Sequence, residues 1–324
     1  MKQYINTTKC RFVLRFFIAA CALLLQASLK AQDGTAAPAN AITKAKAKPV
    51  KNTFQSTLLI DDQTVMVPVK GTFAMEIMHR LGTVQNGSED VWGLFASANM
   101  RIGFDYSPVN NLYLGTGITK TKMLWDGSAK YALLKQTKHK YPVSITYYGD
   151  IAYDTRKDPN KILFTFGSDR LSYFNQIMVA RKFSDKFSLQ VSASVSHQNS
   201  VPGYYTQYDS VAKVKFQAMQ FDHIAMGVCV RYKLTEGTAF IIDYDQPITK
   251  HNENNPSPNV AFGFEFNTSG HTFQLFAGNY VLLNPQQNNL FNKNTPFSYT
   301  QTDGTKRSGG QFVIGFNITR LWNF

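Results

Sequence analysis

Hydrophobic and polar residues alternate along most of the chain from residue 72 to residue 324. In the segment 187–198, Phe187, Leu189 and Val191 occupy alternate positions, and serine and glutamine fill the positions between them. Successive side chains of a strand point to opposite faces, so each such segment predicts a strand with one apolar face and one small or polar face. We predict twelve strands, at 72–80, 98–106, 112–122, 128–136, 142–153, 170–182, 187–198, 223–234, 238–246, 259–267, 271–281 and 310–321.

The connections between the predicted strands alternate in length. The short ones, of five residues or fewer, are 107–111, 137–141, 183–186, 235–237 and 268–270. The connections between them are longer, except for 123–127. Bacterial outer-membrane barrels have short periplasmic turns and long external loops, whereas the rival soluble sandwich follows no such rule. We therefore predict an all-β fold: an antiparallel transmembrane β-barrel of about 12 strands, with both barrel termini in the periplasm.

Residues 1–31 have the features of a secretory signal peptide. Four basic residues precede an apolar run at 16–25, which is too short to cross a bilayer as a helix, and Ala31 offers a small residue for cleavage. Cys21 follows a lipobox-like Ile-Ala-Ala, but the apolar run continues beyond it. Removing residues 1–31 takes away five basic and no acidic residues, so the formal charge falls from +13 to about +8 and Cys229 remains as the one cysteine.

Residues 32–71 predict a periplasmic lead that is partly disordered. The stretch 32–53 is rich in alanine, lysine, proline and asparagine and lacks apolar periodicity. The stretch 54–71 contains β-branched residues and indicates a short hairpin or a plug-like segment, and the sequence leaves both interpretations open. The predicted outer-membrane barrel occupies residues 72–324.

The last predicted strand ends with aromatic residues on one face. Phe316, Trp322 and Phe324 share that face, and the sequence ends on Phe324. This pattern resembles the C-terminal insertion signal read by the outer-membrane insertion machinery, although an ordinary amphipathic strand would look similar. The predicted partners are therefore this machinery during assembly and the lipid of the outer membrane.

Composition favours a lipid environment and gives no sign of catalysis. The chain has 25 phenylalanines and 16 tyrosines, more than a soluble domain usually exposes. Its lysines are scattered and export is expected, so the positive charge does not indicate nucleic acid. The six histidines have no metal-ligand spacing, and no serine lies two positions from His197 on its strand face. We predict a non-enzyme with no catalytic residue, no cofactor and no metal.

Several motifs resemble the Bacteroidota β-barrel family called domain of unknown function 5777. They are His79-Arg80-Leu81-Gly82, the run 98–106 (ANMRIGFDY), Leu114-Gly115-Thr116-Gly117, Trp125-Asp126-Gly127, the run 130–136 (KYALLKQ), Asp169-Arg170-Leu171-Ser172-Tyr173 and Ala180-Arg181-Lys182-Phe183-Ser184. The resemblance covers roughly residues 54–324. It implies an outer-membrane barrel of a Gram-negative bacterium and supplies no catalytic residues.

The polar strand faces supply the candidate functional residues. The predicted lumen-facing residues are Arg101, Asp105, Asp150, Gln190, Arg231, Lys233, Asp243, Asp245 and Glu265. Such side chains can set ion selectivity, or they can pair and fill a narrow barrel, and their mixed signs predict no ion preference. We expect a passive porin or channel-like protein with a narrow, partly side-chain-filled lumen, for which small solutes are the candidate cargo. The alternative is a non-catalytic structural or binding barrel that displays external loops or docks a periplasmic partner. No oligomeric state is predicted.

Overall fold

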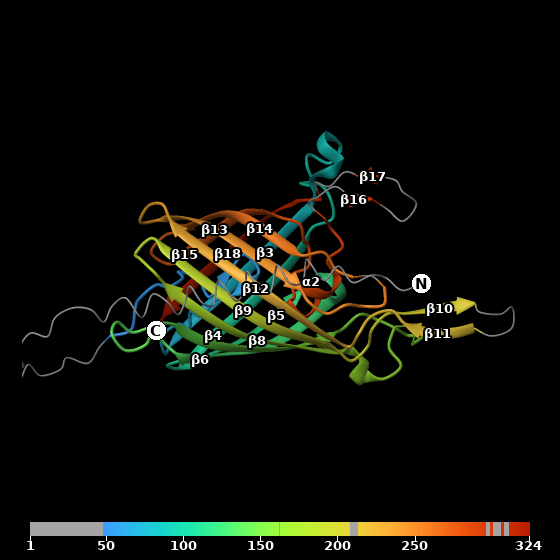
Figure 1. Ribbon diagram of the computed structural model, residues 1–324, viewed down its shortest axis with the longest axis horizontal. Helices are drawn as coiled ribbons and strands as arrows, with labels where there is room; N and C mark the ends of the chain where they lie inside the picture. Colours follow the sequence, from blue (N-terminus) through green and yellow to red (C-terminus); the bar gives the residue numbers. More distant parts are fainter. Residues whose placement is uncertain are drawn as a thin grey trace, which may run out of the picture.

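Twelve long antiparallel strands close into a barrel (Figure 1). The structure, a computed structural model, describes residues 48–161, 163–207, 213–253, 255–295, 299–300, 306–307 and 311–324. The barrel strands are β3 (Thr72–Thr83), β4 (Asn99–Val109), β5 (Leu112–Thr119), β6 (Leu124–Leu134), β7 (Ser144–Asp154), β8 (Leu171–Lys182), β9 (Phe187–Gln198), β12 (Asp222–Lys233), β13 (Thr238–Pro247), β14 (Asn259–Asn267), β15 (His271–Gly278) and β18 (Val313–Asn323). Each of the twelve predicted segments overlaps one of these strands, so the predicted fold class is confirmed.

Neighbours along the chain are neighbours in the barrel, and the last strand closes on the first. In the β18–β3 pair, Ile318 lies opposite Ile77 and Trp322 lies opposite Phe73. Two small hairpins, β10 (Gly203–Gln207) with β11 (Lys213–Gln217) and β16 (Tyr299–Thr300) with β17 (Lys306–Arg307), belong to the connections rather than to the wall.

The connections alternate in length around most of the barrel; the exceptions are 120–123 between β5 and β6, which is short, and 135–143 between β6 and β7, which is longer than it. The turns from β4 to β5 and from β8 to β9 are short and lie at the end where the C-terminus is found, whereas β10, β11, β16 and β17 lie at the opposite end (Figure 1). The connection predicted at 123–127 is wrong, because a single turn, η3 (Thr121–Met123), leads directly into β6. Asp126 and Gly127 are therefore strand residues, although an Asp-Gly pair taken by itself is a typical turn sequence.

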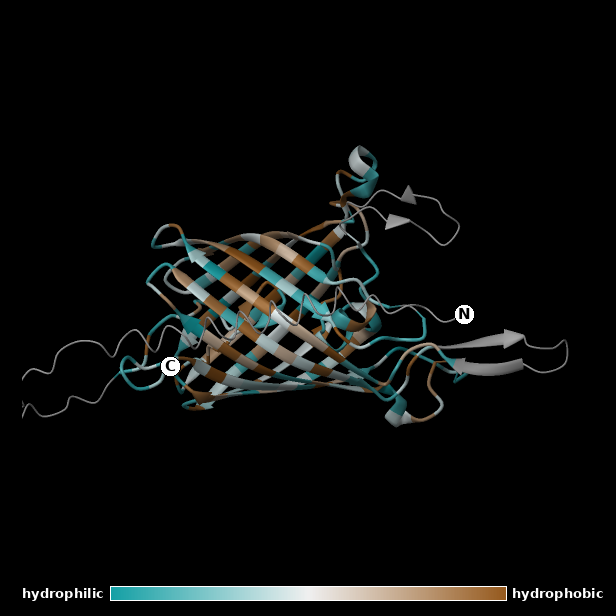
Figure 2. Cartoon of the chain, viewed as in Figure 1, coloured by the Kyte–Doolittle hydropathy of each residue, from teal (hydrophilic) through white to brown (hydrophobic). Residues whose placement is uncertain are grey.

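The outer surface of the wall is apolar. On β14, Phe262, Phe264 and Phe266 alternate with buried or interior residues and are 42–45 % exposed. Hydrophobic and hydrophilic bands alternate along the strands, as expected when one face meets lipid and the other faces the interior (Figure 2). Among the described residues, the helices are all too short or too polar to cross a membrane.

The segment that precedes the first barrel strand lies inside the barrel. Residues 53–67 include the two-residue strands β1 (Leu58–Leu59) and β2 (Asp62–Gln63), which pair antiparallel. Phe54, Leu59 and Ile60 of this segment are at most 1 % exposed. The sequence left a short hairpin or a plug-like segment open for residues 54–71, and the structure combines the two, because the hairpin of β1 and β2 lies inside the barrel. We call residues 53–67 the plug.

Candidate functional site

Two glutamine side chains of the wall hold the open edges of the plug hairpin. Gln274 on β15 accepts a hydrogen bond from the Ile60 N–H at 2.9 Å and donates one to the Leu58 carbonyl at 3.0 Å. Gln190 on β9 accepts from the Val65 N–H at 2.9 Å and donates to the Gln63 carbonyl at 2.7 Å. Each amide thus bonds the N–H and C=O of alternate residues, as a neighbouring strand would, and satisfies backbone groups that water cannot reach.

Further wall residues bond the plug from other directions. Thr57 donates to Glu76 Oε1 at 2.7 Å, and its carbonyl accepts from Lys130 Nζ at 2.9 Å. On the far side, Thr146 on β7 donates to the Val65 carbonyl at 3.0 Å. Since these partners belong to β3, β6 and β7, the plug is fixed against the wall on several sides.

Arg80 anchors the turn of the plug. Its side chain is fully buried, and Nη2 donates to the Ile60 carbonyl at 3.1 Å and lies 3.5 Å from Asp61 Oδ1. Nη1 donates to Asn317 Oδ1 at 2.9 Å, and the guanidinium lies 4.5 Å from the centre of the Phe276 ring. A buried guanidinium needs such partners because burying an unpaired charge is costly.

A second element fills the lumen next to the plug. Helix α2 (Pro285–Phe291), in the long connection between β15 and β18, buries its residues 286–290. Gln286 donates to Asp150, and Asn288 donates to Asp61 of the plug turn. Gln198 on β9 donates to the Gln286 carbonyl at 2.9 Å. The helix therefore meets the plug inside the barrel, and little open space remains between them.

The space left between the plug and α2 is small. A cavity of about 20 Å³ is lined by Asp61, Asp62, Gln176, Asp245 and Asn288, among others. One water molecule needs about 10–15 Å³ by this measure, so the cavity accommodates one or two waters and no larger solute. In this conformation the described residues leave no solute-sized cavity at the junction.

Lys122 supports α2 from the turn between β5 and β6. Its ammonium donates to Gln287 and lies 4.4 Å from the centre of the Phe291 ring. Burial, and to a smaller extent the nearby Arg156, lower the pKa of Lys122 to about 8 against the opposite effect of Asp154.

The predicted lumen residues fall mainly into the interior, where most have partners. Gln190 and Asp243 contact the plug, and Asp150 contacts α2. Arg101 forms a two-point ion pair with Asp126, at 3.0 and 2.5 Å, and Arg231 pairs with Glu265 at 2.8 Å. Asp105 and Asp245 are also buried.

One of the predicted lumen residues lies at the barrel rim instead. Lys233 ends β12 and pairs at 2.7 Å with Glu236, whose side chain is exposed in the following turn. It follows the same alternation as Arg231, but the strand ends there, so a lumen role for Lys233 stays a prediction.

The predicted C-terminal insertion residues belong to β18 and the residue after it: Phe316 lies near the start of the strand and Trp322 near its end. Phe316 stacks on His79 with ring centres 5.0 Å apart, and Trp322 contacts Phe73 at 5.5 Å. Phe324 is 92 % exposed. Its role in insertion stays a prediction.

Sequence reasoning missed several interior residues that hold the plug. They are Glu76, Arg80, Lys130, Gln274 and Asn317. Each occupies an inward position of a predicted strand, so the alternation that found Arg101 could also have found them. What the alternation could not show is their shared target, because the plug lies far from most of them in sequence.

The buried charges inside the described part of the barrel are not balanced. The buried acidic residues are Asp62, Glu76, Asp105, Asp126, Asp150, Asp154, Asp243, Asp245 and Glu265, nine in all. The buried basic residues are the four side chains of Arg80, Arg101, Lys130 and Arg231. The interior is therefore rich in carboxylates although the whole chain carries a formal charge of +13.

Fold and lumen together define a membrane β-barrel with a plugged interior. The family model described as membrane bound beta barrel domain (DUF5777) matches residues 54–322, and the chain belongs to this family. The match begins at Phe54, so the family domain includes most of the plug.

Solved structures with some similarity are membrane channels and transporters. The NanC porin has a TM-score of 0.42 at 9 % identity, covering 78 % of this chain and 99 % of the porin. An outer membrane channel of Pseudomonas putida F1 has a TM-score of 0.42 at 11 % identity, covering 79 % and 97 %. The toluene transporter TodX of P. putida has a TM-score of 0.36 at 8 % identity, covering 80 % and 91 %. Similarities this weak carry no argument about function, and a search of curated proteins finds no match.

Proposed function

We propose that this chain is a non-catalytic, channel-type barrel of a Gram-negative, Bacteroidota-type outer membrane, whose lumen is closed by its own plug. The observation that carries the proposal is the set of wall side chains, Gln190 and Gln274 above all, that bond the plug backbone. Small solutes would pass only when the plug leaves its seat, so the protein is a gated channel rather than a permanently open porin.

The proposed orientation places both termini of the barrel domain, and with them the entrance to the plug, on the periplasmic side. It rests on the expected signal peptide and on the short turns, which lie at the same end as the C-terminus. Helix α2 belongs to a long connection and would then enter the lumen from outside. The plug is accordingly accessible to a periplasmic partner, and α2 to an extracellular ligand.

A structural or binding barrel is the second candidate, and the same closure favours it. Barrels of eight strands are filled by wall side chains, and those of sixteen or more leave aqueous channels. This twelve-stranded wall lies between those limits, and here the plug and α2 occupy the space that the wall side chains leave. Conductance distinguishes the two candidates.

The test is single-channel recording in planar bilayers with four proteins. The wild-type chain is expected to give no steady discrete conductance. Deleting residues 53–67 should give discrete conductance steps. A double deletion that also lacks residues 285–291 should give larger conductance steps. A deletion of equal length in the expected lead, residues 32–46, is the matched control and should behave as the wild type.

Two results would change the proposal. Steady, large conductance of the wild-type chain would contradict closure by the plug. A double-deletion protein that is folded, as judged by a gel mobility shift on boiling, but gives no conductance would favour the structural or binding barrel.

A further inference from the structure

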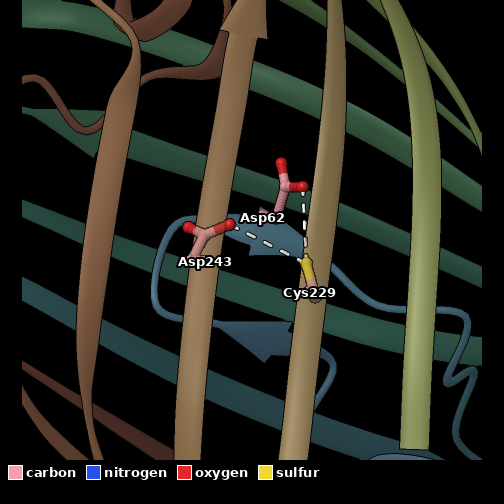
Figure 3. A group of neighbouring side chains, drawn as sticks. All are labelled: Asp62, Cys229 and Asp243. Carbon is pink, nitrogen blue, oxygen red and sulfur yellow. Dashed lines mark hydrogen bonds between the residues drawn. The ribbon is translucent and has the colours of Figure 1, made fainter. Parts of the chain in front are cut away.

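We propose that Asp62, Cys229 and Asp243 form a binding site for a divalent transition-metal ion of the Zn²⁺ class, which joins the plug to the wall. Asp62 belongs to β2 of the plug, and Cys229 and Asp243 lie on β12 and β13. The three side chains are buried and point toward one another (Figure 3). The proposal does not depend on whether the barrel conducts.

The spacing of the donor atoms suits a small ion. Cys229 Sγ lies 3.5 Å from Asp62 Oδ2 and 3.8 Å from Asp243 Oδ1, and all three donor atoms are within 4.8 Å of one another. In a tetrahedral Zn²⁺ site with Zn–S of about 2.3 Å and Zn–O of about 2.0–2.2 Å, sulfur and oxygen are about 3.5–3.7 Å apart. The observed spacing needs only small side-chain shifts to reach this geometry.

An unpartnered amide oxygen at the cluster also indicates a missing ligand. Gln176 is 2 % exposed, and its Nε2 lies 3.2 Å from Asp62 Oδ1 and 3.1 Å from Ser192 Oγ. Its Oε1 is buried and has no hydrogen-bond partner among the described residues. Buried acceptors are rarely left without a partner. Nε2 is the amide atom that faces Asp62, and a half-turn of the amide, which exchanges Oε1 and Nε2, would turn the oxygen toward a cation bound there and let it coordinate the ion.

The bare backbone of Gly227 leaves room at the same place. A Cβ on Gly227 would lie only 2.4 Å from Ser192 Oγ, 2.6 Å from Asp245 Oδ1 and 2.8 Å from Asp62 Oδ2. Glycine thus allows three oxygen atoms to converge beside the Asp62–Cys229–Asp243 group. Asp245 and Ser192 are available as a further ligand and as a hydrogen-bond partner of the ligands.

The charge of the cluster favours a cation. Asp62, Asp243 and Asp245 are buried carboxylates without an ion pair to lysine or arginine in the described part of the chain, whereas Asp61 beside them has Arg80. Like charges at this spacing repel strongly in a medium from which water is largely excluded. A divalent ion offsets two of them, and the Cys229 thiol releases its proton to water on binding.

The sulfur decides the class of metal. Thiolates favour Zn²⁺ and similar transition-metal ions, whereas Mg²⁺ and Ca²⁺ prefer an all-oxygen shell. Because Asp62 comes from the plug and the other two ligands from neighbouring strands of the wall, the bound ion would hold the plug hairpin against β12 and β13.

The experiment measures metal binding by the full chain purified from membranes in detergent. After treatment with a chelator, the protein is titrated with Zn²⁺ and, separately, with Co²⁺, whose bond to a thiolate gives a charge-transfer absorption band. We expect one ion per chain and the thiolate band with Co²⁺. Asp62→Asn and Cys229→Ser should each weaken Zn²⁺ binding by about a hundredfold, since losing even a group that hydrogen-bonds a ligand costs about 10- to 100-fold.

Asp105→Asn is the matched control, because Asp105 is another buried interior carboxylate but lies outside the cluster. It should leave the affinity unchanged. The gel mobility shift on boiling verifies that each variant is folded, and the Co²⁺ band of the wild-type chain tests the site without any variant. A wild-type chain that binds no ion, or binds Co²⁺ without the thiolate band, overturns the proposal, as does equal affinity in Asp62→Asn and Asp105→Asn.

Discussion

Replacing Gln190 with leucine should loosen the plug without breaking the barrel wall. The variant removes the partner of the Val65 N–H, bonded at 2.9 Å, and that of the Gln63 carbonyl, bonded at 2.7 Å. Each buried backbone group left without a partner costs about 1–3 kcal/mol, so the two together weaken the seated plug by about 2–6 kcal/mol. If water hydrogen-bonds the freed Val65 N–H and Gln63 carbonyl, the loss of stability lies near about 2 kcal/mol, the lower end of this range.

The rate at which a cysteine in the plug reacts measures this loosening. Ser56→Cys places a thiol at a position that is 2 % exposed, and peptide mass analysis separates its labelling from that of Cys229. The thiol at position 56 reacts only after the plug has left its seat. Since 1.4 kcal/mol corresponds to a factor of ten, a loss of about 2 kcal/mol in Gln190→Leu should accelerate labelling at least about 30-fold. Gln246→Leu is the matched control, because the partners of the Gln246 amide among the described residues are the adjacent Pro247 carbonyl and Tyr244, neither of which belongs to the plug. Labelling of the Gln190→Leu protein within twofold of its parent would refute the reasoning.

Three further predictions concern other parts of the barrel. Arg101→Met leaves Asp126 buried without its partner and should lower the free energy of unfolding by about 3–5 kcal/mol, measured from denaturant midpoints. Adding Asp126→Leu to the same chain should restore most of this loss. Because the folded-state pKa of Lys122 is about 8 against its ordinary 10.5, the unfolded chain binds more protons between these values, so stability should rise with pH across that window and Lys122→Met should abolish the rise. Deleting Phe324 should slow the appearance of the heat-modifiable form in cells while leaving the denaturant midpoint of the assembled barrel unchanged, and equal assembly rates would count against an insertion signal.

The wall could be predicted from the sequence because each strand shows the alternation of apolar and polar residues within its own segment. Phe262, Phe264 and Phe266 alternate with small or polar residues, and that pattern alone fixes a strand and its outer face. Arg101 and Glu265 follow from the same rule as interior residues. The boundary at 123–127 was wrong because an Asp-Gly pair suits both a turn and a strand whose carboxylate finds an interior arginine.

The plug could not be predicted in the same way. Leu58, Leu59 and Ile60 are all buried, so the segment has no exposed face whose polar residues could alternate with its apolar ones. Its backbone is satisfied by Gln190 and Gln274, which lie 125 and 214 residues away from their partners in the sequence. The metal cluster is hidden for the same reason, since Asp62, Cys229 and Asp243 meet only when the barrel has closed around the plug.

The short link between the plug and β3 makes the plug a tethered ligand of its own barrel. Residues 68–71 span at most about 14 Å when extended, and Gly71 is held at the rim by a hydrogen bond from its N–H to the Ser107 carbonyl at 2.8 Å. When the plug leaves its seat, its C-terminal end at Val67 stays within about 14 Å of the rim, and so short a tether gives an effective concentration in the millimolar range. Rebinding is then independent of how much protein the membrane contains. Each barrel would open and close as a single molecule, with the lifetime of the open state set by the plug's own off-rate and by any partner that captures it.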